Sequence, residues 1–112
     1  MSEPMRMPIF PLGVVLLPGM NMPLHIFEER YKEMIGFCLS SKSEFGIVNY
    51  DGGRMKSAGC LAGITRILKR YPDGRLDIMT RGSKRFEIEE VYEENSYLEA
   101  RITCFDDADA EE

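Results

Sequence analysis

The sequence predicts a mainly β fold with a single helix (α+β): about six or seven strands that curl into a small closed or half-closed antiparallel barrel, and one amphipathic helix. Three observations carry this prediction. Apolar residues recur three or four positions apart over residues 27–39, which is helical spacing. Apolar and polar residues alternate along residues 75–81 and 97–105, which is typical of strands with one face buried. Turn sequences containing proline, glycine or asparagine separate the segments and favour strands that reverse direction.

The first strand is expected at Arg6–Phe10, and a hairpin is expected directly after it. Leu17-Pro18-Gly19-Met20 has proline and glycine at the central positions of a type II turn, where glycine tolerates the positive φ. We therefore expect Gly13–Leu17 to pair with Met20–Leu24. Prolines lack a backbone donor, so these strands should lie at an edge or rim, or begin at the proline; the prolines are Pro8, Pro11 and Pro23.

The helix follows this hairpin. Its predicted inner face consists of Phe27, Tyr31, Met34, Ile35, Cys38 and Leu39. Glu28 precedes Lys32 by four residues, which is the favourable order for an ion pair on the outer face. Ser40–Ser43 should end the helix.

A short buried strand is expected at Phe45–Tyr50, followed by a loop at residues 51–53. A long hairpin should begin at Cys60 and turn at Pro72-Asp73-Gly74, where the glycine supplies a positive φ. Its first strand should bury one row, Cys60, Ala62, Ile64 and Leu68. Its second strand, Arg75–Arg81, should bury Leu76, Ile78 and Thr80.

Gly82 marks a bulge or sharp bend before a strand at Arg85–Tyr92, and residues 93–96 form a turn into Tyr97–Phe105. In that last strand, one face carries Leu98, Ala100, Ile102 and Cys104. Residues 1–105 are therefore expected to form one domain, and the acidic residues 106–112 to form a disordered tail.

Composition narrows the class of protein. No apolar run approaches the roughly 18 residues that span a bilayer, so no membrane association is expected. Cys38, Cys60 and Cys104 are odd in number and lie among apolar neighbours, as expected of reduced, buried thiols. Together with the lack of a signal segment at the N-terminus, this predicts a cytoplasmic protein.

The order of the motifs resembles a known family. The first part of the chain is similar to the opening of Lon N-terminal domains. The similar segments are Pro8-Ile9-Phe10-Pro11-Leu12-Gly13, its continuation to Pro18-Gly19, and then Pro23–Glu28 with Arg30-Tyr31. The later part of the chain is similar to the long hairpin and the following strand of that family, in the segments Gly59–Ala62, Pro72–Gly74 and Gly82–Phe86. The resemblance covers nearly the whole chain.

This resemblance implies a PUA-like pseudobarrel that is plugged on one side by the amphipathic helix, and a role in recruiting protein substrates. The family includes the recruiting domain of ATP-dependent Lon proteases, free-standing LON-domain proteins and a domain of cereblon-type receptors. The expected function is non-catalytic recognition of unfolded or degron-bearing protein segments for ATP-dependent proteolysis. The expected partner is protein, and the sequence does not indicate the oligomeric state.

Catalytic and metal sites are not expected. His25, the only histidine, has no serine or cysteine at a recognisable catalytic spacing, so it should pack or make a local hydrogen bond. The three isolated cysteines lack paired metal-ligand spacing. The sequence therefore predicts no enzyme activity, no cofactor and no metal.

The candidate binding site lies on the expected hairpin before the helix. Methionine is flexible and polarizable and suits a surface that accepts varied segments, which points to Met20 and Met22. Glu29 and Arg30 are expected to form a polar rim beside them. The competing interpretation is that these methionines fill the core.

Charge leaves a second function open. Residues 66–85 carry seven basic side chains against two acidic ones, a net +5, whereas residues 86–112 carry −10. PUA-like barrels elsewhere bind RNA, so the basic strands are a possible RNA surface, although the overall charge of −5 and the lack of a surface aromatic series speak against nucleic acid. A third reading is that the chain is half of a larger LON protein. A single basic face would favour RNA, and pairing of basic with acidic strands would favour an ordinary solvated surface.

Overall fold

The structure is a computed structural model that describes residues 4–105. Its elements, in chain order, are β1 (Met5–Leu12), β2 (Asn21–Ile26), α1 (Glu29–Ser41), β3 (Phe45–Asp51), β4 (Arg54–Arg70), β5 (Leu76–Tyr92) and β6 (Glu99–Phe105). The acidic tail expected at residues 106–112 lies outside the described residues.

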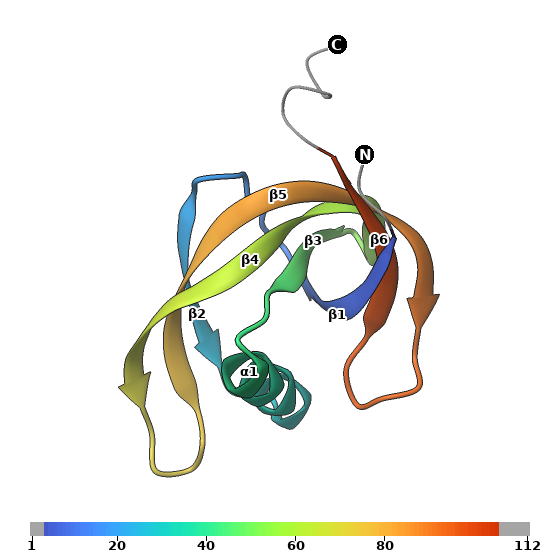
Figure 1. Cartoon of the computed structure of the whole chain (residues 1–112). Coiled ribbons are helices and arrows are strands. Elements are labelled where there is room, and N and C mark those ends of the chain that lie inside the picture. Colours follow the sequence, from blue (N-terminus) through green and yellow to red (C-terminus); the bar gives the residue numbers. More distant parts are fainter. Residues whose placement is uncertain (1–3, 106–112) are drawn as a thin grey trace.

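The strands form one sheet in the order β2-β5-β4-β3-β1-β6, and β6 also pairs with β5. This second pairing closes β5, β4, β3, β1 and β6 into a ring, and β2 extends the sheet along β5. Figure 1 shows α1 lying against the concave side of the sheet, between the β4–β5 hairpin and β1. The predicted fold class, a small barrel plugged by one helix, is confirmed.

One strand pair departs from the antiparallel pattern. β1 and β3 run parallel, with Ile9 opposite Gly46, while the other pairs are antiparallel. Parallel neighbours need a long crossover, and here the crossover carries both β2 and α1. The helix is thus placed inside the connection between two neighbouring strands of the ring.

The turn predicted at residues 17–20 is present, but the prediction that Gly13–Leu17 pairs with Met20–Leu24 as a hairpin is wrong. The Met20 N–H donates to the Leu17 carbonyl at 3.0 Å, and Gly19 has a φ of 82°. Residues 13–17 form no strand, and β2 pairs instead with the first half of β5. The local turn signal was correct, but the backbone groups of β2 find their partners far along the chain. We call residues 13–20 the arm.

The prediction that proline-bearing strands lie at an edge holds for β2, the terminal strand of the sheet, which contains Pro23. It is wrong for the place of β1 in the sheet, because β1 lies between β3 and β6. However, Met5–Pro8 pairs only with β6, and Ile9–Leu12 pairs only with β3. Apart from the Ile9 N–H, which donates to the Leu98 carbonyl at 3.0 Å, each half of β1 therefore has one side without a strand partner, where a missing donor is tolerated.

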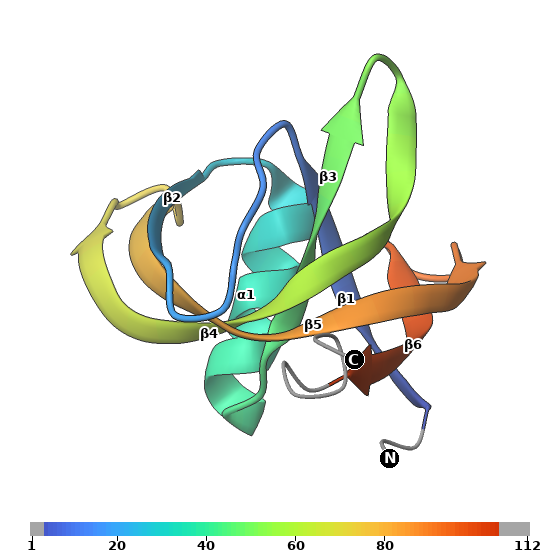
Figure 2. The ribbon, with the colours of Figure 1, turned by 90° about the horizontal axis from the view of Figure 1, so that it is seen from above.

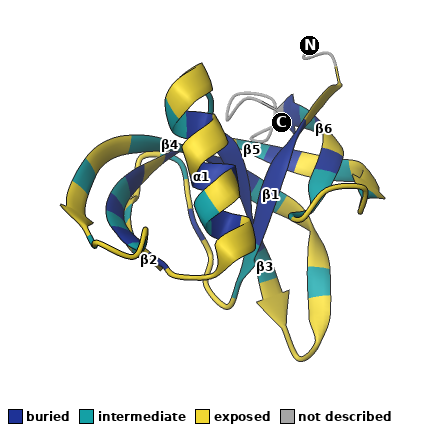
Figure 3. Cartoon of the chain, turned by 90° about the horizontal axis from the view of Figure 1, so that it is seen from below, coloured by how far each residue is buried: buried dark blue, intermediate teal, exposed yellow. Residues whose placement is uncertain are grey.

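The helix packs much as its periodicity predicts. Four side chains of the expected inner face are buried: Tyr31, Met34, Ile35 and Cys38. Figure 3 shows this buried stripe on α1 and the exposed opposite side. Phe27 is the exception, since it precedes the N-cap Glu28 and is 59% exposed. Lys32 pairs with Glu29 at 2.9 Å, where we expected Glu28.

The long hairpin turns at Gly74, whose φ is 94°, as predicted. Its second strand buries Leu76, Ile78 and Thr80 as predicted. In β4 the alternation fails at Leu68, which is 40% exposed, while Ile67 packs against the core. Register shifts between Ile64 and Arg66 and between Ile67 and Lys69 change which side chains face inward.

The core has two parts. One lies between α1 and the sheet, and the other fills the ring around Phe86, which is fully buried. The predicted face of β6 contributes Ala100, Ile102 and Cys104 to the second part. The three cysteines are buried, as expected. Burial also raises the pKa of the Cys38 thiol, which keeps that side chain in its unreactive form.

Candidate functional site

A groove of about 550 Å³ opens at the end of the barrel where β2 leads into α1. Its lining comes from β1, the β2–α1 junction, the end of β3 and the residue before β6. These lining residues are Phe10, Pro11, Leu12, His25, Phe27, Glu28, Arg30, Tyr31, Tyr50 and Leu98. Most of them are apolar or aromatic, so the groove is a candidate binding site.

The floor of the groove is a stacked aromatic pair. The ring of Phe10 lies 4.0 Å from that of Tyr31, centroid to centroid, and both residues are buried. Burial raises the pKa of the Tyr31 hydroxyl, so this side chain is neutral near pH 7. Because Phe10 comes from β1 and Tyr31 from the first turn of α1, the floor is held by two packed elements.

The walls carry aromatic side chains that remain exposed. Phe27 is 59% exposed and stacks beside His25 at 5.7 Å, and Tyr50 at the end of β3 is 47% exposed. Tyr50 lies in β3, and Figure 2 shows that the β3–β4 hairpin extends beyond the ring. Large apolar side chains left in solvent around a hollow mark a contact surface more often than scattered single ones do.

Arg30 forms the charged rim of this groove. Its guanidinium lies 4.7 Å from the centre of the Tyr31 ring and pairs with the Glu28 carboxylate at 3.3 Å. Both charged groups are about half exposed, so the ion pair is weak and Arg30 can leave Glu28 to pair with a bound segment. Glu29 does not line the groove, because it turns to Lys32 on the other side of the helix start.

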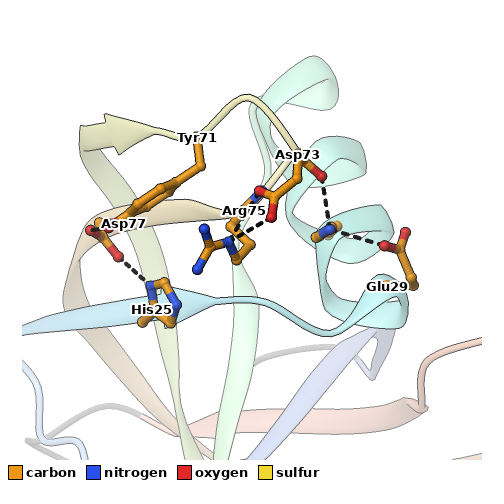
Figure 4. Close-up of polar contacts among 7 residues, drawn as sticks. His25, Glu29, Tyr71, Asp73, Arg75 and Asp77 are labelled. Atoms are coloured by element: carbon orange, nitrogen blue, oxygen red, sulfur yellow. Dashed lines mark hydrogen bonds and ion pairs between the residues drawn. The ribbon is translucent and has the colours of Figure 1, made fainter.

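His25 packs beside Phe27 and makes a side-chain hydrogen bond, as expected, although its partner Asp77 is 52 positions away along the chain and not local in sequence. Its Nδ1 lies 2.5 Å from the Asp77 carboxylate, whose second oxygen accepts from the Tyr71 hydroxyl at 2.7 Å (Figure 4). These bonds, the one from His25 foremost, lower the pKa of Asp77, and the carboxylate raises the pKa of Tyr71. The arrangement ties β2 to β5 and to the end of β4, and so fixes one wall of the groove.

The helix start is tied to the same region. Lys32 donates to the Asp73 carbonyl at 3.0 Å while pairing with Glu29, a link that Figure 4 draws between α1 and the β4–β5 turn. Asp73 in turn accepts from the backbone N–H and the guanidinium of Arg75, which lower the pKa of its carboxyl group.

The structure does not bring the four predicted site residues together. Met20 and Met22 lie at one end of β2, and Glu29 and Arg30 lie beyond the other, so about six residues at about 3.3 Å each, or roughly 20 Å, separate them. Met20 is 41% exposed on the arm, beside other exposed apolar side chains. Met22 is half-buried and packs against the core.

Sequence reasoning missed Phe27 and Tyr50. It assigned Phe27 to the inner face of the helix by spacing alone. The consecutive acids Glu28 and Glu29 were a signal that the helix begins at that point, which would have left Phe27 outside it. Tyr50 carried no comparable signal, because its place beside the helix start depends on the parallel pairing of β1 with β3.

The described residues contain neither a metal site nor a membrane-spanning helix. Within residues 4–105, no three His, Cys, Asp or Glu side chains come together as a metal site. In the same range, no helix is long and apolar enough to span a membrane.

Comparison with known proteins gives a family. Residues 6–112 match the model of the ATP-dependent protease La (LON) substrate-binding domain. The Lon protease of Parabacteroides distasonis is 33% identical over 109 residues, covering 89% of this chain and 13% of that protease. The Lon protease of Flavobacterium johnsoniae is 32% identical over 108 residues, with coverages of 88% and 13%. The chain thus spans about an eighth of the length of these relatives.

Solved structures agree on the fold. A Lon N-terminal domain protein from Xanthomonas campestris superimposes with a TM-score of 0.81 at 28% identity, covering 91% of this chain and 60% of that one. The N-terminal domain of a Mycobacterium avium complex Lon protease gives a TM-score of 0.72 at 20% identity, with coverages of 91% and 55%, which supports the fold alone. The chain therefore belongs to the family of ATP-dependent protease La (LON) substrate-binding domains.

Proposed function

We propose that this domain recognises unfolded or degron-bearing protein segments, without catalysing a reaction itself, and that it does so for ATP-dependent proteolysis. The family supports a role in substrate binding. The observation that carries the proposal is the groove itself, where the exposed rings of Phe27 and Tyr50 flank a buried aromatic floor.

The groove has the chemistry of a site for apolar side chains. Unfolded segments expose large apolar residues that a folded protein buries, and the transfer of these residues out of water lowers the free energy. Exposed aromatic rings offer a large contact area at a low entropic cost, because each has only two side-chain torsions. Arg30 at the rim adds a charge that fixes the position of polar or acidic neighbours in the bound segment.

The same lining argues for binding over catalysis. The residues of the groove include neither a serine, threonine or cysteine nucleophile nor a lysine. Its histidine is bound to Asp77, and its acid, Glu28, is paired with Arg30. A groove of this kind retains a segment and leaves cleavage to another active site.

We further propose that the arm extends this surface. Val14, Val15, Leu17 and Met20 are between 41% and 56% exposed, and a Cβ built on Gly13 would lie 3.8 Å from the carbonyl of Tyr50. The arm therefore starts beside the groove. In this arrangement Met20 contacts substrate at the far end of the arm, while Met22 supports β2 from the core side.

The test measures the affinity of the domain for a fluorescent, permanently unfolded model protein. Replacing Phe27 and Tyr50 together with serine should weaken binding by about tenfold or more, since each removes a large apolar contact. Phe37→Ser is the control, because Phe37 is 49% exposed on the helix but lies outside the groove. Unchanged binding in the double variant, or equal loss in the control, would refute the groove as the site.

A further inference from the structure

A second surface lies on the outer face of the sheet formed by β2, β5 and β4. Because Leu76, Ile78 and Thr80 point into the core, the alternating residues Asp77, Met79 and Arg81 point outward. We call this side, away from α1, the outer face.

Two shallow hollows lie next to each other on the outer face. The first, of about 370 Å³, is lined by Asn21, Thr65, Arg66, Met79 and Arg81. The second, of about 480 Å³, is lined by Pro23, Leu24, His25, Leu68, Lys69 and Asp77. Pro23 of the second pairs in register with Met79 of the first, so the two hollows adjoin.

The outer face carries positive charge that the described part of the chain leaves uncompensated. Arg6, Arg75 and Arg101 each pair with a carboxylate within 3.2 Å. Within residues 4–105 no such partner is recorded for Arg66 or Arg81, which are exposed around the first hollow. Pairing of basic with acidic strands thus holds for the β1, β5 and β6 surface but not for the outer face.

The carboxylate in the second hollow offsets only part of this charge, because Lys69 is among the groups that lower the pKa of Asp77. Asp77 is bound by His25 and by the Tyr71 hydroxyl. The Lys69 ammonium lies 4.8 Å from the centre of the Tyr71 ring, so it is held at the edge of the hollow. The outer face therefore presents cations at both ends.

Apolar side chains lie between these cations. Leu68 is 40% exposed, turned outward by the register shifts in β4, and Met79 is half-buried next to Arg66 in the ladder. A polyanion alone would need no such apolar strip. Tyr71 does not offer a free ring for stacking bases, because Lys69 and Arg75 lie over it.

We propose that the outer face binds an acidic, extended segment of a partner protein, in which one apolar residue contacts Leu68 and Met79 and flanking carboxylates meet Arg66, Arg81 and Lys69. Charge complementarity selects the acidic segment, and the apolar strip distinguishes it from a nucleic acid. The domain then has two protein-binding surfaces that meet at His25, which lines both the groove and the second hollow, while Phe27 and Tyr50 line the groove but neither hollow.

The experiment measures fluorescence anisotropy of a labelled peptide that has one leucine flanked by aspartates and glutamates. Arg66→Glu with Arg81→Glu should weaken binding by about tenfold or more, because both reverse a charge that faces the peptide. The matched control is Arg54→Glu with Lys56→Glu, which changes the net charge equally on the exposed β3–β4 hairpin and should stay within about twofold. Leu68→Ser should weaken binding while leaving its salt dependence unchanged.

Four results would overturn the proposal: no measurable binding of the acidic peptide, equal weakening in the Arg54 and Lys56 control, no effect of Leu68→Ser, or tighter binding of single-stranded RNA that Arg66 and Arg81 control. The last would make the outer face a nucleic-acid surface. Circular dichroism checks folding, and glutamine replaces glutamate at both arginines if the reversal unfolds the chain. The serine variant of Phe27 and Tyr50 should bind the acidic peptide normally, which separates this proposal from the groove.

Discussion

The backbone of Gly19 is bonded to that of Gly82: the Gly19 N–H donates to the Gly82 carbonyl at 2.9 Å, and the Gly82 N–H donates to the Met20 carbonyl at the same distance. The tip of the arm is thereby fixed to the point on β5 where its partner changes from β2 to β6. This contact positions both the tip of the arm and the start of β2, at the end of β2 that lies away from the groove.

Gly82→Ala should destabilise the fold. A Cβ on Gly82 would lie 2.3 Å from the Leu17 carbonyl oxygen, so the arm must move, at a cost of about 1 to 3 kcal/mol. The control is Gly36→Ala on the exposed side of α1, where a Cβ meets nothing within 4 Å and helix propensity should improve by about 1 kcal/mol. Thermal melting of the two variants should therefore shift in opposite directions, and a stable Gly82→Ala variant would contradict the docking of the arm.

Gly74→Val tests the turn of the long hairpin. At a φ of 94° a β-branched side chain is strained, so the variant should lose at least about 1 kcal/mol of stability. Urea denaturation measures this loss. An unaltered midpoint would mean that the turn does not adopt this conformation in solution.

Ile35→Ala should cost about 2 to 5 kcal/mol, because Ile35 is fully buried under the helix. Glu29→Ala is the comparison, since Glu29 is 85% exposed and its ion pair should contribute less than about 0.5 kcal/mol. Lys32 is a poorer comparison than its helical position suggested, because it also bonds the Asp73 carbonyl. Similar losses at Ile35 and Glu29 would mean that the helix faces the other way.

Acid should weaken the fold partly through Asp77. The pKa of this carboxyl group is lower in the folded chain than its ordinary value of 3.8, so its ionised form stabilises the fold above that value. The contribution is lost as the pH falls through the lowered folded value. Asp77→Asn should therefore be less stable than the parent near pH 7 and should lose less stability on acidification to about pH 2.

Urea midpoints at the two pH values measure this difference. The variant keeps Asp73, whose pKa is also lowered, so some acid sensitivity should remain. The account of Asp77 fails if parent and variant lose the same amount on acidification.

The sequence predicted those parts of the fold that depend on local spacing. The buried rows Leu76–Thr80 and Ala100–Cys104, the inner face of α1 and the turn at Gly74 all follow from periodicity or from a positive φ. The arm could not be predicted, because its partner Gly82 is 63 positions from Gly19 and only the backbone makes the contact. Leu68 was misplaced because a register shift leaves no mark in the alternation.

The candidate site was less predictable than the fold. Arg30 is exposed, as expected, but it lies at the rim of the groove and not beside Met20 and Met22. The groove joins residues from the first strand to Leu98, and no spacing in the sequence reveals that convergence. The methionines drew attention by their number. Their burial depends on which side of β2 faces the core: Met22 packs inward and Met20 remains on the arm.

The most direct test of the central claim is to map by NMR the surface of the domain that contacts a bound segment. A peptide rich in aromatic residues is titrated into the isotopically labelled domain, and the shifts of backbone amides are followed. The groove predicts that the largest shifts occur at Phe27, Arg30 and Tyr50, with smaller ones along the arm and none around Phe37. Shifts centred on Phe37, or on the outer face around Leu68, with the groove unaffected, would contradict it.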